Sequence, residues 1–314
     1  MSMKCNCKQK CIKTRKETLA EITNLYDACP QCNTKTLKKA MPLQRQVKLE
    51  KINENYGKCS KCRKRHIDMV MAHVLKIMIE NKQIAASASI RKVGTPLITP
   101  AIPLEHLPYL SKESLVIITT ACDQVTAQRI MGEVPEIKAI IKGNTDETVG
   151  ILDENSEINN YELLGGCDIR CDIQYTDTEA ILIYKQQSKI HIEYPKQESP
   201  KIMEVSRALE KYESPTVLDA MCGPGTLGIY ALLKNASKVV FNDINRESIN
   251  TLKTNLKING INEETYEIYN ENILDLTEKI GRKFNMGIID AFPGVDSSSY
   301  REALEKICDE VIII

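Results

Sequence analysis

The chain has 314 residues, of which 42% are hydrophobic and 27% are charged. This composition is typical of globular proteins and excludes a disordered or fibrous chain, and the length allows two or three small domains. No apolar run reaches membrane-spanning length, and the first residues, MSMKCNCKQKC, contain no apolar signal core. We therefore expect a cytoplasmic protein without a membrane partner.

The charge is balanced overall, with 42 basic and 42 acidic residues, but it is unevenly distributed. Residues 1–83 contain 19 Lys and Arg against 7 Asp and Glu, whereas residues 84–314 contain 23 against 35. A basic segment on an acidic body indicates an anionic partner. Nucleic acid is the first candidate, and a merely solvated surface is the alternative.

Residues 1–83 form a cysteine-rich module that holds seven of the twelve cysteines. Without an export signal, so many cysteines favour metal ligands or free thiols over disulfides. Two C-x-x-C pairs occur, CPQC at 29–32 and CSKC at 59–62. A two-residue gap lets both thiolates face one tetrahedral metal ion. The pairs therefore predict a zinc site made of Cys29, Cys32, Cys59 and Cys62.

A second group of thiols, Cys5, Cys7 and Cys11, lies in the sequence CNCKQKC. A single zinc ion held by the two pairs does not need them. They either form a second zinc site with His66 or hold an iron–sulfur cluster, which also takes cysteine thiolates. Zinc is favoured, because C-x-x-C pairing is usual for structural zinc.

The segment RKRHIDMVMAHVLKIMIENK follows the last pair and predicts an amphipathic helix, since apolar residues recur every three or four positions from Ile67 to Met78. Arg63, Lys64 and Arg65 crowd its first turn, where cations oppose the helix dipole. Helix stability does not favour this arrangement, which indicates a contact with phosphate.

Residues 84–200 predict a small α+β domain. A proline-rich stretch, TPLITPAIPLEHLPYL, predicts an extended linker or wrapping arm. The expected elements are strands at 114–121, 137–143 and 167–175, a short helix at 123–133, and a β-hairpin at 181–194. No cluster of acid and base side chains occurs here, so we assign this domain no chemistry. Four of its residues are expected to be ordinary core or surface side chains: Cys122, Cys167, Cys171 and His191.

Residues 201–314 alternate apolar strands with helical patterns. Strands are expected at 216–220, 238–243, 266–269, 286–290 and 310–314, with helices that begin near 226, 246, 273 and 297. This alternation predicts an α/β domain, a Rossmann-like parallel sheet of five strands with helices on both faces. Ligands of such sheets bind at the carboxyl ends of the strands.

The stretch VLDAMCGPGTLG at 217–228 supplies a glycine-rich turn after the first of these strands. Its glycines fit the dinucleotide fingerprint, but Asp219 at the strand end would repel a pyrophosphate and suits a cationic amino-acid end. A nicotinamide dehydrogenase is therefore disfavoured. Asp243, in FNDIN, is placed to accept both hydroxyls of a ribose, and Asn272 follows the third strand, where it is placed to contact an adenine amino group. Together these groups describe S-adenosylmethionine.

The segments VLDAMCGPGTLGIYALL, VVFNDINRESINTLKTNLKINGI and FNMGIIDAFPG resemble class I S-adenosylmethionine-dependent methyltransferases. Within that class they are most similar to tRNA guanine-N2 dimethyltransferases. The resemblance covers residues 201–314, and that family has D-P-F-G where this sequence has DAFPG and has no matching cysteine-rich module. The resemblance implies cofactor contacts from Asp219, Met221, Gly223, Gly225, Asp243, Ile244, Asn272 and Ile273.

The resemblance also implies a catalytic loop after the fourth strand. Asp290 would accept a hydrogen bond from the attacking amine, Phe292 would stack on a planar substrate ring, and Pro293 would stiffen the loop. The alternatives for Asp290 are an N-cap for the helix near 297 or a solvated loop acid.

We therefore expect a methyltransferase that acts on RNA, specifically on a tRNA base nitrogen, with residues 1–83 binding phosphates. Two alternatives stay open. One is methylation of a small molecule or cofactor precursor, and the other is a metal-binding scaffold that only senses the cofactor. The family's sheet has a sixth and a seventh strand beyond the point where this sequence stops. We expect the hairpin of the middle domain, or a second copy in a homodimer, to cover that edge.

Overall fold

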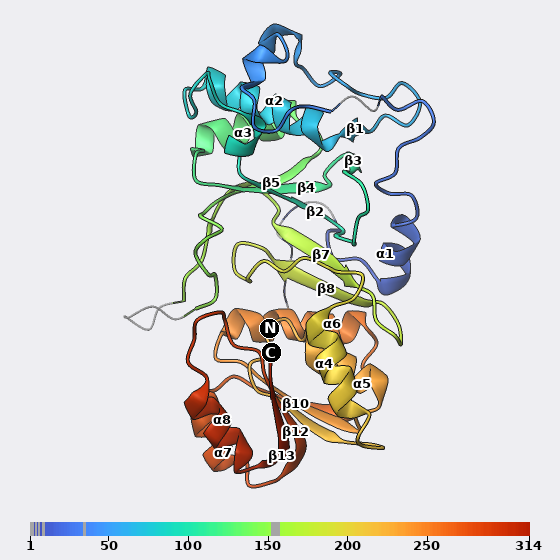
Figure 1. The fold of residues 1–314 in the computed structure, drawn as a ribbon, viewed down its shortest axis with the longest axis vertical. Helices are drawn as coiled ribbons and strands as arrows, with labels where there is room; N and C mark the ends of the chain where they lie inside the picture. The colour runs from blue at the N-terminus through green and yellow to red at the C-terminus, as the bar shows by residue number, and fades with distance from the viewer. Residues whose placement is uncertain (1–2, 4, 6, 8–9, 34–35, 152–157) are drawn as a thin grey trace. The chain divides into compact units, whose positions relative to one another are not determined.

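The computed structural model describes residues 3, 5, 7, 10–33, 36–151 and 158–314 (Figure 1). The chain forms two compact units. Unit 1 contains Thr148–Asn160 and Cys171–Ile314, and unit 2 contains Cys5–Glu147 and Tyr161–Arg170. The division into residues 1–83, 84–200 and 201–314 stays a prediction, because these units do not show which segments fold alone. Among the described residues, no helix combines the length and the apolar character needed to cross a membrane.

Unit 1 is built on a sheet of five strands in the order β11-β10-β9-β12-β13, and every neighbouring pair is parallel. The strands are β9 (Thr216–Asp219), β10 (Lys238–Asn242), β11 (Tyr266–Tyr269), β12 (Phe284–Ile289) and β13 (Cys308–Ile313). The chain adds β10 and β11 on one side of β9 and then returns to add β12 and β13 on the other. The predicted α/β fold of this segment is confirmed, and the order of the strands reverses between β9 and β12.

Successive residues of these strands face opposite layers. Val217, Val239 and Phe241 pack with one group of helices, whereas Leu218 and Val240 pack with the other. The first group is α4 (Pro200–Leu209), α5 (Thr226–Lys234) and α6 (Arg246–Ile258), and the second is α7 (Ile273–Lys279) and α8 (Ser298–Glu305) (Figure 1). Both faces of the sheet are thereby buried, as parallel sheets require.

A separate pair of strands, β7 (Ile169–Gln174) and β8 (Ile181–Gln186), precedes this sheet in the sequence. The predicted hairpin at 181–194 is wrong, because β8 pairs with β7 and no strand follows it before α4. The connection between the two strands is closed by Thr176, whose Oγ1 accepts hydrogen bonds from the amides of Thr178 and Glu179. A hydroxyl that bonds the backbone two or three residues further along is typical of a turn.

Two asparagines of α6 bond the backbone of β8. Asn255 Oδ1 accepts from the Tyr184 amide at 2.9 Å, and its Nδ2 donates to the Tyr184 carbonyl at 3.0 Å and to the Pro224 carbonyl at 2.9 Å. Asn259 bonds both backbone groups of Leu182 in the same way, at 3.0 and 2.8 Å. Four helical residues rise about 6 Å, close to the span of two strand residues, so the two amides match alternate residues of β8. Asn255 thereby ties β8 to the glycine-rich turn.

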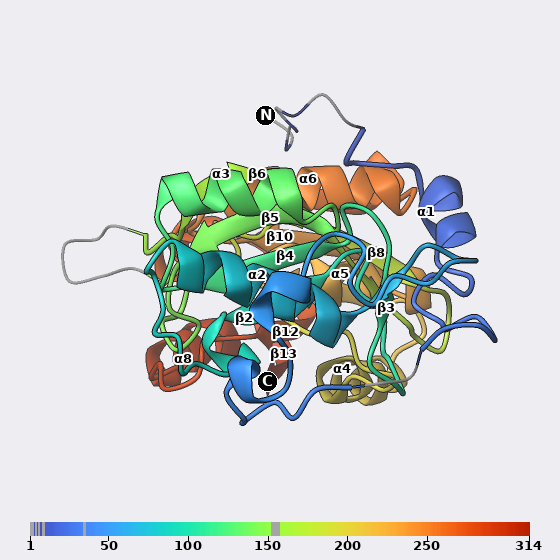
Figure 2. The ribbon, with the colours of Figure 1, turned by 90° about the horizontal axis from the view of Figure 1, so that it is seen from above.

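Unit 2 contains a four-stranded sheet in the order β2-β4-β5-β6, in which β4 and β5 are parallel and the outer pairs are antiparallel. Its strands are β2 (Thr95–Ile98), β4 (Leu115–Thr119), β5 (Ile137–Lys142) and β6 (Glu162–Gly166), and β1 (Arg65–His66) pairs separately with β3 (Tyr109–Leu110). The helices are α1 (Arg15–Glu21), α2 (Ile67–Glu80) and α3 (Gln124–Glu133). Short 3-10 turns lie at Leu43–Arg45, Leu49–Lys51 and Ile90–Lys92, and a further one in unit 1 at Glu263–Thr265. Helices α2 and α3 lie on the same face of the sheet (Figures 1 and 2).

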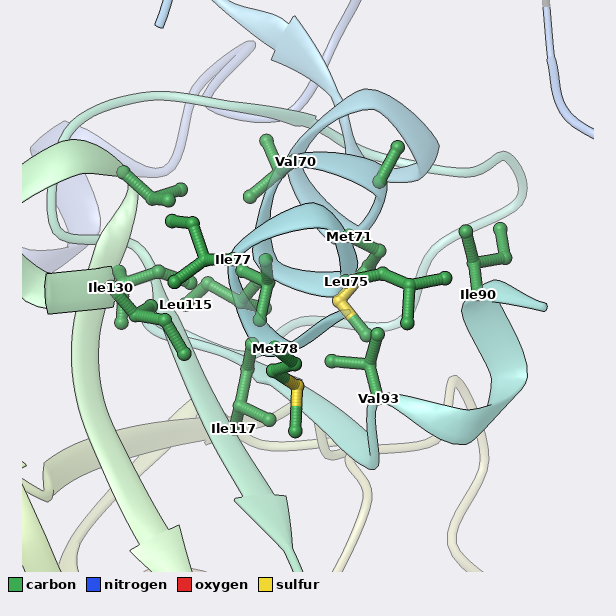
Figure 3. Packing of buried hydrophobic residues seen from close by; sticks show 14 of the residues in the cluster. Val70, Met71, Leu75, Ile77, Met78, Ile90, Val93, Leu115, Ile117 and Ile130 are labelled. Atoms are coloured by element: carbon green, nitrogen blue, oxygen red, sulfur yellow. The ribbon is translucent and has the colours of Figure 1, made fainter. Parts of the chain in front are cut away.

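Helix α2 lies at the centre of the core of unit 2. Leu75 and Met78 point toward Ile117 of the sheet and Val93 (Figure 3). The predicted helix is present, but it is buried on nearly every side rather than amphipathic, and even Asp68 is only 2% exposed. The reason is that the irregular segment before it packs on its outer face, with its buried apolar residues in the same cluster as those of the helix.

Replacing Asn255 with Leu should destabilise unit 1. The change leaves both backbone groups of Tyr184 and the Pro224 carbonyl without a partner, and buried unsatisfied groups cost about 1–3 kcal/mol each, so we expect a loss of at least ~2 kcal/mol. Thermal unfolding followed by circular dichroism measures this loss. Lys253→Ala, an exposed change on the same helix, is the control. Equal melting temperatures for the two variants would contradict the bridging role of Asn255.

Candidate functional site

Three carboxylates meet at the carboxyl end of the sheet in unit 1. Asp219 ends β9, Asp243 follows β10, and Asp290 follows β12. These strands are neighbours, and the reversal between β9 and β12 is the place where α/β sheets bind ligands. All three acids line one cavity of about 1000 Å³. The predicted ligand position therefore coincides with a cavity large enough for a nucleoside cofactor.

Asp219 is the most deeply buried of the three acids, at 1% exposed. Its Oδ2 accepts a hydrogen bond from the Gly228 amide at 2.9 Å, whereas Oδ1 has no hydrogen-bond partner among the described residues. Burial, and then the negative charges of Asp290 and Asp243, raise the pKa of Asp219 to about 8. A buried acceptor without a donor is unfavourable. This oxygen is therefore suited to a bound cation or hydrogen-bond donor.

Asp243 fastens the glycine-rich turn to the end of β10. Its Oδ2 accepts from the Gly223 amide at 2.8 Å, and its Oδ1 accepts from the Asn245 amide at 2.7 Å. Burial raises the pKa of Asp243 to about 6, although both hydrogen bonds oppose the shift. Gly223 has a φ of 51°, and a Cβ added there would meet nothing within 4 Å. The turn therefore presents bare backbone to open space.

Most of the remaining predicted cofactor residues line the same cavity: Met221, Ile244, Asn272 and Ile273. Ile244 is 47% exposed, which is high for an apolar side chain and leaves its surface available to a ligand. Gly225 does not line the cavity. Its φ is 96°, and a Cβ there would lie 2.3 Å from Leu252 Cδ1, so packing of α5 against α6 already accounts for this glycine.

Asn272 has a structural role in addition to lining the cavity. Its Oδ1 accepts from the Leu274 amide at 3.0 Å and caps α7. An adenine amino group is a donor and would need that same oxygen. The predicted contact to the amino group therefore competes with the helix cap.

Asn242, which the sequence analysis missed, holds the ends of three strands together. It is 1% exposed, and its Nδ2 donates to the carbonyls of Ala220 and Glu271, at 3.1 Å each. Its Oδ1 accepts from the Glu271 amide at 3.2 Å. A polar residue at the last position of an otherwise apolar strand was the available signal.

Asp290 forms an ion pair with a lysine that the sequence analysis also missed. Lys201 Nζ, on α4, lies 2.8 and 2.7 Å from the two carboxylate oxygens of Asp290 and 3.3 Å from Glu193 Oε1. Burial raises the pKa of Asp290, and Lys201 opposes that rise. Asp290 is not the N-cap of α8, because Ser297 holds that position and the Ser298 amide donates to Asp296 Oδ1 at 3.0 Å.

Phe292 and Pro293 line the cavity together with His191. The rings of His191 and Phe292 are 5.5 Å apart in an edge-to-face arrangement. His191 was expected to be an ordinary strand residue, but it follows β8 in an irregular segment, and burial lowers its pKa. This pair of rings lines the cavity together with two further aromatic side chains, Tyr194 and Tyr300.

The two C-x-x-C pairs converge in unit 2. Their sulfur atoms lie within 4.8 Å of one another, with separations of 3.7 Å for Cys29–Cys32, 3.6 Å for Cys29–Cys59 and 3.5 Å for Cys32–Cys62. Four sulfurs at 2.3 Å from one tetrahedral zinc would be about 3.8 Å apart. The observed separations fit a single ion closely.

Cys5, Cys7 and Cys11 also converge, but their fourth neighbour is Cys167 rather than His66. His66 lies elsewhere, where its Nδ1 accepts from the Asp68 amide at 3.2 Å and its ring contacts Tyr109 edge to face. The prediction of His66 as a ligand is therefore wrong. Cys167 was expected to be an ordinary thiol because it lies far along the sequence from Cys5, Cys7 and Cys11.

Two of the three basic residues before α2 make contacts within unit 2. Arg65 is fully buried, donates from Nε to Glu136 Oε1 at 2.8 Å and makes a second hydrogen bond to the same carboxylate. Lys64 Nζ donates to the Asn24 carbonyl at 2.7 Å. Arg65 is therefore not available to phosphate, and the prediction is wrong for this residue. For Arg63, which is exposed, and for Lys64 the contact with phosphate stays a prediction.

Residues 201–313 match a family model described as Conserved hypothetical protein 95. A segment of 66 residues, 21% of this chain, is 38% identical to the ribosomal protein L11 methyltransferase of Agathobacter rectalis and covers 20% of it. One of 100 residues, 31% of this chain, is 33% identical to the tRNA (guanine(26)-N(2))-dimethyltransferase of Pyrobaculum islandicum and covers 27% of it. One of 55 residues, 17% of this chain, is 49% identical to the tRNA (guanine(37)-N(1))-methyltransferase of Caenorhabditis elegans and covers 12% of it.

The chain thus spans less than a third of the length of each of these relatives. All three are named as methyltransferases, and their named substrates differ. The predicted resemblance of the C-terminal segment to methyltransferases is confirmed.

Proposed function

We propose that this chain is an S-adenosylmethionine-dependent methyltransferase that methylates RNA, with a base nitrogen of tRNA as the acceptor. The observation that carries the proposal is the convergence of Asp219, Asp243, Asp290 and the bare turn at Gly223 on one cavity at the reversal of a parallel sheet. The similarity of residues 201–313 to methyltransferases supports the reaction class.

The chemistry of the cavity fits S-adenosylmethionine, which carries an ammonium and a sulfonium. Asp219 offers a buried oxygen without a partner, and a cation is the group that relieves it. Asp243 keeps lone pairs for ribose hydroxyls beyond the two backbone bonds that it accepts. Met221, Ile244 and Ile273 provide apolar surface for a purine ring. When bound, the cofactor supplies an activated methyl group.

Asp290 is the proposed catalytic residue, because it stands at the end of β12 in the same cavity and accepts hydrogen bonds. It would orient the attacking amine and take its proton. Lys201 favours the ionised form of Asp290, since it opposes the rise in the pKa of that carboxyl that burial causes. Phe292 and Pro293 would hold a planar base in line with the methyl group, and such positioning supplies much of the rate of a methyl transfer.

The proposal of RNA as the substrate rests on charge and on the relatives. Two of the three relatives are named as tRNA methyltransferases. Unit 2 exposes a run of cations between residues 38 and 51: Lys38, Lys39, Arg45, Lys48 and Lys51. Such a run binds phosphates without reading sequence, which suits RNA. A zinc ion held by the two C-x-x-C pairs would stabilise the loops that flank this run.

Transfer of labelled methyl groups from S-adenosylmethionine to unmodified tRNA tests the function. Asp290→Asn should lower kcat by about 10²–10⁴-fold, because the amide cannot take the proton, while cofactor affinity stays within a few-fold. Asp275→Asn, an exposed acid on α7, is the matched control. Label found only in protein or in small molecules would overturn RNA as the substrate, and full activity of Asp290→Asn would overturn the catalytic assignment.

Binding of S-adenosylmethionine at pH 7 should release protons. With a pKa of about 8, Asp219 is mostly protonated at pH 7, and a bound cation favours its ionised form, so the proton leaves. Calorimetric titrations in two buffers of different ionisation enthalpy measure the number released. Asp219→Asn should release fewer protons than the wild type, and Asp275→Asn should match the wild type. Equal release by all three proteins would contradict the assigned contact.

Lys201→Gln should shift the acid limb of the pH–rate profile to higher pH. Lys201 lowers the pKa of Asp290, so its removal raises that pKa, and the ionised base then requires a higher pH. Profiles of kcat between pH 5 and 9 for the wild type and the variant show the shift. Lys211→Gln, which removes a surface ion pair with Glu310, is the control. A uniform fall in rate without a shift would exclude this role.

A further inference from the structure

We propose that Cys5, Cys7, Cys11 and Cys167 form a second zinc site in unit 2, separate from the site of the C-x-x-C pairs and independent of the proposed methyl transfer. Their sulfur atoms all lie within 4.8 Å of one another. Three of the ligands come from a short segment near the start of the chain, and the fourth follows β6. No carboxylate or imidazole belongs to this group among the described residues.

The sulfur separations favour a single ion over a cluster. Cys5 and Cys7 lie 2.8 Å apart, Cys7 and Cys11 3.1 Å, and Cys5 and Cys167 3.3 Å. One tetrahedral zinc requires about 3.8 Å, so the sulfurs need only move apart slightly. In a four-iron cluster each cysteine binds a different iron, which spreads the thiolates further. The compact group therefore fits one zinc ion.

The position of Cys167 is set by the sheet of unit 2. Its amide donates to the Lys138 carbonyl at 3.0 Å. Gly166, just before it, has a φ of 82°, and a Cβ there would lie 2.1 Å from the same carbonyl. Only glycine allows this approach, so the backbone places Cys167 against β5. One of the four ligands is therefore positioned by the sheet before any metal binds.

The positive charge of Lys138 complements the negative charge of the thiolates. Its Nζ donates to Cys11 Sγ at 3.1 Å. Four thiolates and one Zn²⁺ carry a net charge of about −2, which a neighbouring cation stabilises. The same strand thus supplies the backbone that positions Cys167 and the cation that faces Cys11.

The proposed site would link two parts of unit 2 that lie far apart in the sequence. A metal ion that joins Cys5, Cys7 and Cys11 to Cys167 closes a loop of more than 150 residues, as the numbering shows, and binds the start of the chain to the β5–β6 pair. Metal binding of this kind supplies folding free energy.

Metal analysis of anaerobically purified protein tests the proposal. The wild type should contain two zinc ions per chain, one for each thiol group. Cys167→Ser should contain one and keep its fold by circular dichroism, and Cys29→Ser should lose the other. Cys122→Ala, which removes a buried thiol outside both groups, is the control and should keep two.

Lys138→Gln provides a test that does not depend on losing a ligand. It should keep two zinc ions, but a chelator should remove one of them about 10–100-fold faster than from the wild type, as expected for loss of an outer partner of a metal site. One zinc in the wild type, two in Cys167→Ser, equal chelator rates in Lys138→Gln, or a brown protein with iron and sulfide would each overturn the proposal.

Discussion

The reversal of the parallel sheet between β9 and β12 is the constraint on which the candidate site depends. Parallel strands end at the same edge, so Asp219, Asp243 and Asp290 are forced together. Burial of like charges is unfavourable. Backbone amides of the glycine-rich turn and the amine of Lys201 offset part of the repulsion, but one oxygen of Asp219 keeps no partner among the described residues. The site is therefore electrostatically incomplete and favours a cation over a pyrophosphate.

Neutral amides hold this edge in place. Asn242 joins the ends of three strands, and Asn255 joins β8 to the glycine-rich turn. An amide donates and accepts in the same plane without adding charge. A carboxylate at either position would accept but not donate, and near the three acids it would increase the repulsion. Asparagine thus links these backbone segments without adding negative charge near the three acids. A fixed framework of this kind suits a site in which the placement of the reacting groups supplies the rate.

The sequence predicted the parts of the fold that depend on local pattern. In residues 201–314 the strands and helix starts lie within about two residues of their predicted positions, because apolar strands and helical periods alternate cleanly. The three acids and the glycine-rich turn were also found, since each follows a strand. Lys201 and Cys167 were not, because Asp290 and the other three cysteines of the group lie far from them in the sequence and no local pattern marks the contact. His66 was assigned wrongly for the same reason.

The net positive charge of residues 1–83 is larger than the positive charge that this segment exposes to an anionic partner. Arg65 forms an ion pair with Glu136 inside the core, and Lys64 donates to a backbone carbonyl. Charges separated by more than about 8–10 Å are screened at physiological salt, so a local run of exposed cations matters more than the total. The run between residues 38 and 51 meets that requirement. Because phosphate contacts carry no sequence information, the proposed methylation of RNA would depend on the cavity around Asp290 and Phe292 to select the acceptor base.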